Sequence, residues 1–154
     1  MYGISRISCQ QDVMLVTFPE ADQGAGSMAA FLTAFSDAGV NMDMISQSIP
    51  KGAKADLSFT TSYENWALVM QTLPRLTAGK SGPAPLIGGG YSKLNLFGQE
   101  MEGMCGVAAR VLAVLAGAKV GVELITTSSV DISLLVAAED EDTALSALKE
   151  AFSL

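Results

Sequence analysis

The sequence has 154 residues, of which 49% are hydrophobic, and it carries a formal net charge of -7 with no histidine. Nucleic acids and anionic membrane surfaces both require a positively charged face, so the acidic balance argues against either as a partner. Two cysteines without histidine predict neither a disulfide framework nor a metal site.

The amino-terminal segment reads MYGISRISCQQ and lacks a charged stretch followed by an apolar core. No targeting leader is therefore expected. The most apolar later segment is interrupted by Arg110 and Lys119, which leaves it too short to span a membrane. These features favour a cytoplasmic protein. Ile4 and Ile7 alternate loosely with polar residues, so a short strand is expected over residues 2–10.

An internal repeat dominates the rest of the sequence. Residues 103–128 change from a helical to an alternating apolar period, which predicts a loop, a helix, a turn and a strand. Residues 26–48 show the same pattern, and a further strand and helix follow in both copies. Each copy therefore predicts strand, helix, strand, strand, helix. Matching pairs include Phe35 with Leu115, Val40 with Val120, Ser48 with Ser128 and Asp56 with Asp131.

The ends of the two copies predict how they are joined. The second copy stops after its second helix, whereas the first continues into a connector and a short apolar run at residues 85–87. The spare amino-terminal strand is expected to complete the sheet of the second copy. The sequence thus predicts an α+β fold with two ferredoxin-like βαββαβ domains, the first inserted in the second, with antiparallel sheets and helices on one face. Expected boundaries are 12–89, and 1–11 with 90–154.

A polar loop with the sequence PEADQGAGS leads into the first predicted helix at residues 19–27. The first N–H groups of a helix have no intrahelical partner and carry partial positive charge, so a ligand carboxylate docks readily where glycines permit close approach. The alternative is that the two glycines simply form the turn.

Two segments of the sequence match phosphate-binding motifs, and neither is interpreted as a phosphate site. Gly24, Gly26 and Ala29 satisfy GxGxxA, with Asp43 near the spacing of a ribose-binding acid. The preceding loop is too long, the second copy has no GxG, and an antiparallel unit offers no doubly wound crevice. Residues 78–81, AGKS, have Pro74 in place of the first P-loop glycine and are interpreted as linker.

Two further residue groups could carry chemistry. Cys105 lies in the loop before a helix, where the dipole could lower the pKa of its thiol; the alternative is a packed small residue. Residues 139–142 are acidic and most simply provide favourable charge at a helix N-terminus, rather than a metal site. No nucleophile and base are paired in the sequence, so catalysis and a cofactor are not expected.

Two phrases resemble a known family. The first is GVNMDMISQS at 39–48 followed by DLSFT at 56–60. The second is GVAAR at 106–110 followed by ELITTS at 123–128 and DIS at 131–133. Both resemble the paired ACT domains of aspartate kinases. The resemblance covers essentially the whole chain and is similar in extent to the small regulatory subunit of that family. It implies an allosteric, non-catalytic module of amino-acid biosynthesis that binds an end-product amino acid such as lysine or threonine.

The resemblance also implies site residues and partners. The carboxylate of the effector would meet the loop before the first helix, and Asp43 and Ser48 would meet its amino or side-chain end. A homodimer through ACT domains is expected, with the effector pocket formed where two first repeats meet, and an aspartate kinase catalytic chain is a candidate partner. Ala25 and Cys105 stand where the family usually has proline, so a structural dimerisation module that has lost effector binding is the alternative, with a small enzyme third. The implied loop residues are Gln23, Gly24, Ala25, Gly26, Ser27 and Met28.

Overall fold

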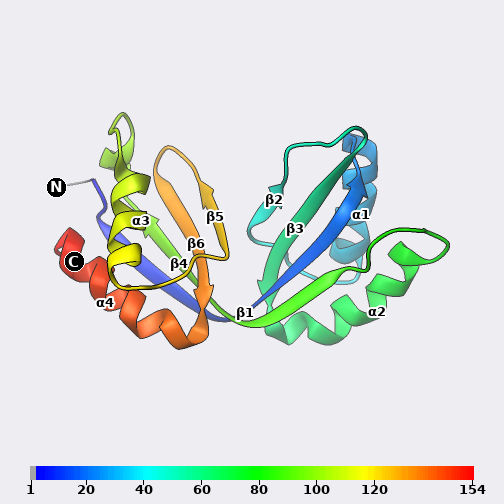
Figure 1. Cartoon of the computed structure of the whole chain (residues 1–154). Coiled ribbons are helices and arrows are strands. Elements are labelled where there is room, and N and C mark those ends of the chain that lie inside the picture. Colours follow the sequence, from blue (N-terminus) through cyan, green and yellow to red (C-terminus); the bar gives the residue numbers. More distant parts are fainter. Residues whose placement is uncertain (1–2) are drawn as a thin grey trace. The chain divides into compact units, whose positions relative to one another are not determined.

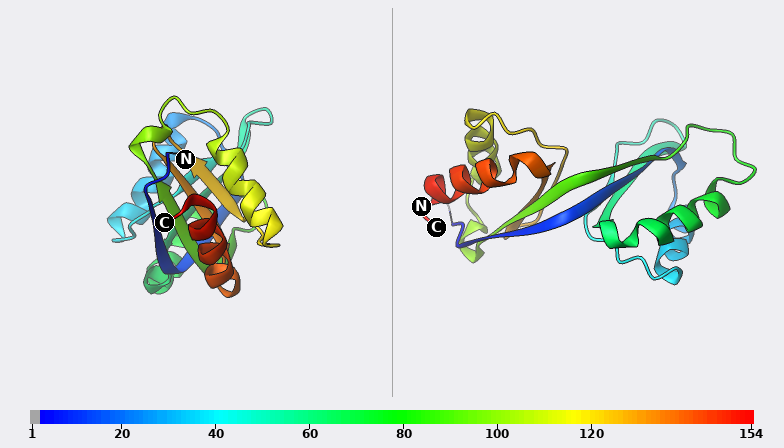
Figure 2. Two further views of the ribbon diagram at one scale, coloured as in Figure 1. Left: turned by 90° about the vertical axis from the view of Figure 1, so that its left-hand side faces the viewer. Right: turned by 90° about the horizontal axis from the view of Figure 1, so that it is seen from below.

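The computed structural model describes residues 3–154; Tyr2, which belongs to the predicted amino-terminal strand, lies outside the described residues. The chain divides into two compact units, Asp12–Gly89 and Gly90–Leu154, and the second also includes the amino-terminal segment up to Gln11. Each boundary falls within a strand, namely β1 (Arg6–Asp22) and β4 (Leu86–Phe97). These two strands are hydrogen-bonded neighbours, and Figure 2 shows them lying side by side.

The continuity of β1 and β4 corrects the expectation of separate short strands at residues 2–10 and 85–87. In β1 the chain passes through Asp12 with a positive φ of 52° and continues as a strand on both sides. In β4 the glycine-rich residues 88–90 stay within the strand although Gly90 has a positive φ of 79°, a conformation that glycine adopts without strain.

The Asp12–Gly89 unit contains α1 (Ala25–Asp37), β2 (Ile45–Gln47), β3 (Lys54–Ser62), a short turn of 3₁₀ helix and α2 (Trp66–Thr77). Its strand order is β2-β3-β1-β4, with β3 antiparallel to both of its neighbours. The two helices contact each other on one side of the sheet (Figure 1). The buried core is Met14, Val16, Phe18, Phe35, Val40, Phe59, Val69 and Leu73.

The other unit contains α3 (Val107–Gly117), β5 (Leu124–Thr127), β6 (Asp131–Ala137) and α4 (Glu141–Phe152). Its strand order is β5-β6-β4-β1, the same arrangement as in the first unit, and α3 contacts α4. The amino-terminal segment belongs to this unit: the Ser5 N–H donates to the Phe97 carbonyl at 2.8 Å. Apolar positions of all these elements form the core, which includes Ile4, Leu94, Leu96, Val111, Leu115, Ile132, Leu134, Leu148 and Phe152.

These observations confirm the predicted α+β, ferredoxin-like fold. Most of the apolar stripe predicted for the first helix of each copy faces the core, since Phe35, Val111 and Leu115 are buried, but Leu112, which was also expected on this face, is 39% exposed. No helix of residues 3–154 is long and apolar enough to cross a membrane.

Candidate functional site

The first turn of α1 is open, as the loop sequence predicts. Gly24 is the N-cap, with φ 141° and ψ 140°, and no side chain caps the helix. Met28 donates the first helical hydrogen bond, to the Gly24 carbonyl at 3.0 Å. The N–H groups of Ala25, Gly26 and Ser27 therefore have no partner within the helix. A Cβ atom at Gly24 or Gly26 would meet nothing within 4 Å, so a ligand can approach this backbone.

Gln23 and Met28, at the two ends of the predicted loop site, have backbone N–H groups that are already used. Gln23 donates to the Ala53 carbonyl at 2.8 Å, and Met28 donates to Gly24. Gln23 is exposed and Met28 half-buried, so only their side chains are available to a ligand.

Ser48 closes the turn between β2 and β3. Its hydroxyl accepts the Asp56 N–H at 2.9 Å. Ser128 occupies the matching position of the other unit and accepts the Asp131 N–H at 3.1 Å. The two copies thus share a turn-closing serine, a structural role that the sequence interpretation of Ser48 missed.

Asp43 is exposed and lies far from the open turn of α1 within one copy of the chain. Its N–H donates to the Thr60 carbonyl, whereas the Gln23 N–H donates to the carbonyl of Ala53. Along the extended chain from Ala53 to Thr60, this separation is about 20 Å at roughly 3.3 Å per residue. A free amino acid is much shorter, so one copy does not bring Asp43 and the helix turn around the same ligand.

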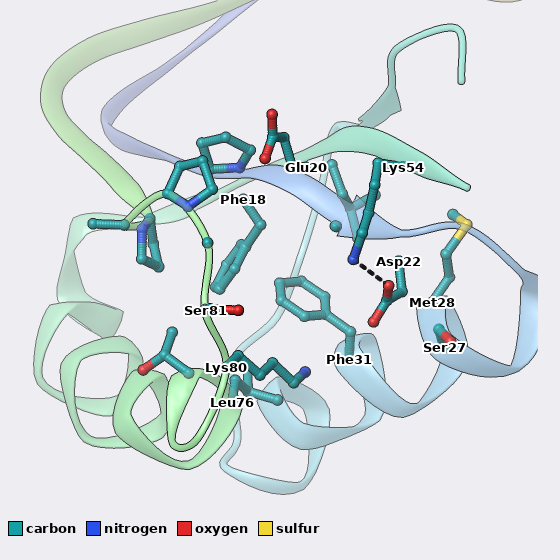
Figure 3. Close-up of a pocket in the computed structure, with 18 of the residues that line it drawn as sticks. Phe18, Glu20, Asp22, Ser27, Met28, Phe31, Lys54, Leu76, Lys80 and Ser81 are labelled. Carbon is teal, nitrogen blue, oxygen red and sulfur yellow. Dashed lines mark hydrogen bonds and ion pairs between the residues drawn. The ribbon is translucent and has the colours of Figure 1, made fainter. Parts of the chain in front are cut away.

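A cavity of about 690 Å³ borders the first turns of α1 (Figure 3). Of the predicted site residues, only Ser27 and Met28 line it. Its charged residues were not predicted as a group, because they come from β1, β3 and the connector after α2 and are widely spaced in sequence. They are Glu20, Asp22, Lys54 and Lys80.

The rim of this cavity carries an ion pair. The Lys54 ammonium lies 2.5 Å from an oxygen of Asp22, with both side chains more than half exposed. The hydrogen bond from Lys54 and its positive charge lower the pKa of Asp22, and the charge of Lys80 adds to this effect. The Asp22 carboxyl is therefore ionised at neutral pH.

The second unit has a smaller cavity, of about 320 Å³, where α3 begins. Met104, Gly106 and Ser128 line it, and by the repeat these positions match Gly24, Gly26 and Ser48.

Both cysteines are free thiols at the surface. Partial burial, together with the charge of Glu141, raises the pKa of Cys9 to about 11, so its thiol is protonated at neutral pH. Cys105 is exposed, so the interpretation of it as a packed residue is wrong. Within residues 3–154 no group of three or more side chains suited to a metal ion was found.

Comparison with known proteins finds similar sequences and similar folds. The model of the ACT domain matches residues 94–152. Aspartokinase from Mycolicibacterium smegmatis is 32% identical over 154 residues, covering 99% of this chain and 36% of that protein. The chain thus spans about a third of the length of such relatives.

Two solved structures have a similar fold over nearly their whole length. The ligand-free regulatory subunit of aspartate kinase from Thermus thermophilus has a TM-score of 0.87 at 23% identity, with 97% of this chain and 99% of that chain covered. A structure of aspartokinase alpha and beta subunits gives 0.83 at 24% identity, with 98% and 99% covered. The resemblance predicted from the two sequence phrases is confirmed.

Proposed function

We propose that this chain, which carries an ACT domain at residues 94–152 and resembles the regulatory region of aspartate kinases along its length, is a non-catalytic module that binds a free amino acid. The observation that carries the proposal is the uncapped first turn of α1, which offers the N–H groups of Ala25, Gly26 and Ser27 beside open space. These groups and the helix dipole would hold the effector's carboxylate. In this proposal residues 12–89 are one ACT domain and residues 1–11 with 90–154 the other.

A second copy of the chain would complete the site. β2 ends the strand order of the sheet, and Ile45 on it and Ile49 beyond it are 44% and 87% exposed. Two copies that pair antiparallel through β2 about a twofold axis would cover this edge. Because the paired strands run in opposite directions, Asp43 of one copy would approach the open turn of α1 in the other.

The charges of this composite site suggest its ligand. The carboxylate of an amino acid would meet the helix turn, and its cationic group would meet Asp43. Ser48 would lie at the same end of the bound amino acid as the helix turn. Lysine and threonine are the first candidates, by analogy with the family. A catalytic aspartate kinase chain is a further proposed partner, since one relative of similar fold is described as aspartokinase alpha and beta subunits.

A thermal-shift screen of the standard amino acids tests effector binding. A ligand at about 100 times its dissociation constant adds roughly 2.7 kcal/mol to the free energy of unfolding. Gly26→Val should weaken every amino acid alike by blocking the helix turn, while leaving the free protein folded, since its Cβ meets open space. Gly121→Val, at an equally open glycine of the other unit, is the control and should change nothing.

Asp43→Asn tests the cationic end of the ligand. It should weaken lysine more than threonine, because a hydrogen bond to a charged group contributes roughly 1.5–3 kcal/mol and a neutral one about 1 kcal/mol. Glu123→Gln alters the matching position of the other unit, where the backbone N–H also donates across the sheet, and should have no effect. The absence of stabilisation by any amino acid at millimolar concentration would favour the structural dimerisation module instead, and a monomer in sedimentation equilibrium would contradict pairing through β2.

A further inference from the structure

The cavity beside α1 has two walls and a floor, all from the Asp12–Gly89 unit. The first turns of α1 form one wall, and the connector at residues 79–85 forms the other (Figure 3). Its volume of about 690 Å³ falls within the range of small-molecule sites, which is roughly 300–1,000 Å³. The cavity is thus large enough for a metabolite.

Apolar side chains form the floor. The rings of Phe18 and Phe31 meet edge to face with centroids 4.1 Å apart, and Phe18 is 8% exposed. Leu57 and Leu76 extend this surface. An apolar group of a ligand would pack on these side chains and leave water.

The rim carries more positive than negative charge near the rings. Lys54 is paired with Asp22, and Lys80 lies close enough to affect the same carboxylate. In Figure 3 the ammonium of Lys80 extends below Phe31, whereas the Glu20 side chain extends away from both rings. Two ammonium groups therefore face one carboxylate at this rim.

The local backbone accounts for the position of Lys80. The helix α2 ends at Thr77, and Gly79 then turns the chain with a φ of 71°. The Lys80 N–H donates to the Thr77 carbonyl at 3.1 Å, which holds the base of the side chain against the end of the helix. The connector thus delivers a cation to the cavity wall.

We propose that this cavity is a second ligand site, which shares only Ser27 and Met28 with the predicted effector loop, and that it binds a small carboxylate bearing an apolar group. The carboxylate accepts a hydrogen bond from the Lys80 ammonium, and the apolar group packs on Phe18 and Phe31. Two sources share this chemistry: an apolar α-amino acid, whose ammonium would meet Asp22, and the corresponding 2-oxo acid. The inference does not depend on an effector at the composite site.

Titration calorimetry of the full chain with L-phenylalanine and with phenylpyruvate tests the proposal. At least one should bind, and the one that does identifies the source. Lys80→Gln should lower its affinity about tenfold, since it removes a charge-assisted hydrogen bond. Phe31→Leu should also weaken it, by reducing the aromatic floor. Lys51→Gln is the matched control, because Lys51 is an exposed cation close to Lys54 in sequence but outside the lining.

Asp43→Asn separates this site from the composite one and should leave the affinity for these two ligands unchanged. The proposal is overturned if neither ligand binds at millimolar concentration, or if Lys80→Gln and Lys51→Gln bind equally well. Loss of binding in Asp43→Asn with retention in Lys80→Gln would assign the ligand to the composite site and would equally overturn it. Unfolding curves of each variant verify that its fold is intact.

Discussion

The two units begin their first helices differently, although their sequences repeat. In one unit β1 continues to Asp22, which pairs with Lys54, and α1 begins at Ala25. A register shift after Phe18 allows this extension by placing an extra residue in β1. In the other unit β4 ends at Phe97, and a 3₁₀ turn and a loop precede α3. The segment that leads into the first helix therefore differs between the two units.

That turn holds the amino-terminal segment in place. A Cβ atom at Gly98 would lie 1.7 Å from the carbonyl oxygen of Gly3, and one at Gly3 would lie 2.7 Å from the nitrogen of Met101. Met101 itself is buried in the core. The segment before α3 therefore packs against the chain's own backbone, whereas the segment before α1 is paired with β3. Both first helices nevertheless begin with an uncapped turn beside open space, at Gly24 and at Gly106.

Deletion of residues 1–10 should have the largest effect on this comparison. It removes the buried Ile4 and the hydrogen bond from Ser5 to Phe97, and it exposes an edge of β4. The loss of one buried aliphatic side chain alone costs about 2–5 kcal/mol. Urea unfolding followed by circular dichroism should show a much lower midpoint or aggregation. An unchanged midpoint would contradict the proposed insertion of one ACT domain in the other, whereas moving the segment to follow Leu154 through a linker should be tolerated.

Exchange of the matched core residues should have the next largest effect. Phe35 lies among aromatic rings, with the Phe59 centroid at 4.9 Å, whereas Leu115 lies in a largely aliphatic core. Phe35→Leu leaves space and loses ring contacts, and Leu115→Phe overpacks its site. Each should lower the free energy of unfolding by about 1–3 kcal/mol.

Leu112→Phe, at an exposed position of the same helix as Leu115, is the control and should change stability by less than about 0.5 kcal/mol. If both core exchanges leave the denaturation midpoint unchanged, the two cores are interchangeable. The difference between the units would then be confined to their loops.

The sequence predicted what depends on local periodicity. The stripes ending at Phe35 and Leu115, the strand and helix order of each unit, and the open turn at Gly24 all follow from patterns within a few residues. The lengths of β1 and β4 did not, because positive φ at Asp12 and a glycine run can either end a strand or let it continue. The expectation that the effector pocket forms between two copies came from the family resemblance and not from local periodicity.

The cavity beside α1 could not be predicted for a different reason. Asp22, Lys54 and Lys80 belong to three segments, and each alone has the ordinary composition of a solvated loop or strand end. Only the pairing of β1 with β3 brings Asp22 opposite Lys54. Tertiary contacts thus create a charge arrangement that has no local signature.

The smallest expected effect concerns acid stability and the start of the second helix in each unit. The Glu141 carboxylate accepts hydrogen bonds from the Ser92 hydroxyl at 2.5 Å and the Gln11 amide at 2.7 Å. The first of these is the main cause that lowers the pKa of Glu141 below its ordinary value of 4.5, and the second adds to it. A depressed folded-state pKa stabilises the fold above pH 4.5, and this contribution is lost as the pH falls through the folded value.

Glu141→Gln should therefore flatten the decrease in unfolding free energy below pH 4.5, measured by urea titration at a series of pH values. It should also lower the pKa of Cys9 from about 11 toward its ordinary value of 9.0, because the Glu141 charge contributes to the increase after burial. The pH dependence of thiol alkylation measures this second change. Glu64→Gln, at an exposed glutamate just before the second helix of the other unit, is the control, and its decrease in unfolding free energy at acid pH should follow that of the wild type. If the unfolding free energy decreased equally below pH 4.5 in the wild type, Glu141→Gln and Glu64→Gln, the polar contacts of Glu141 would contribute nothing to the difference between the units.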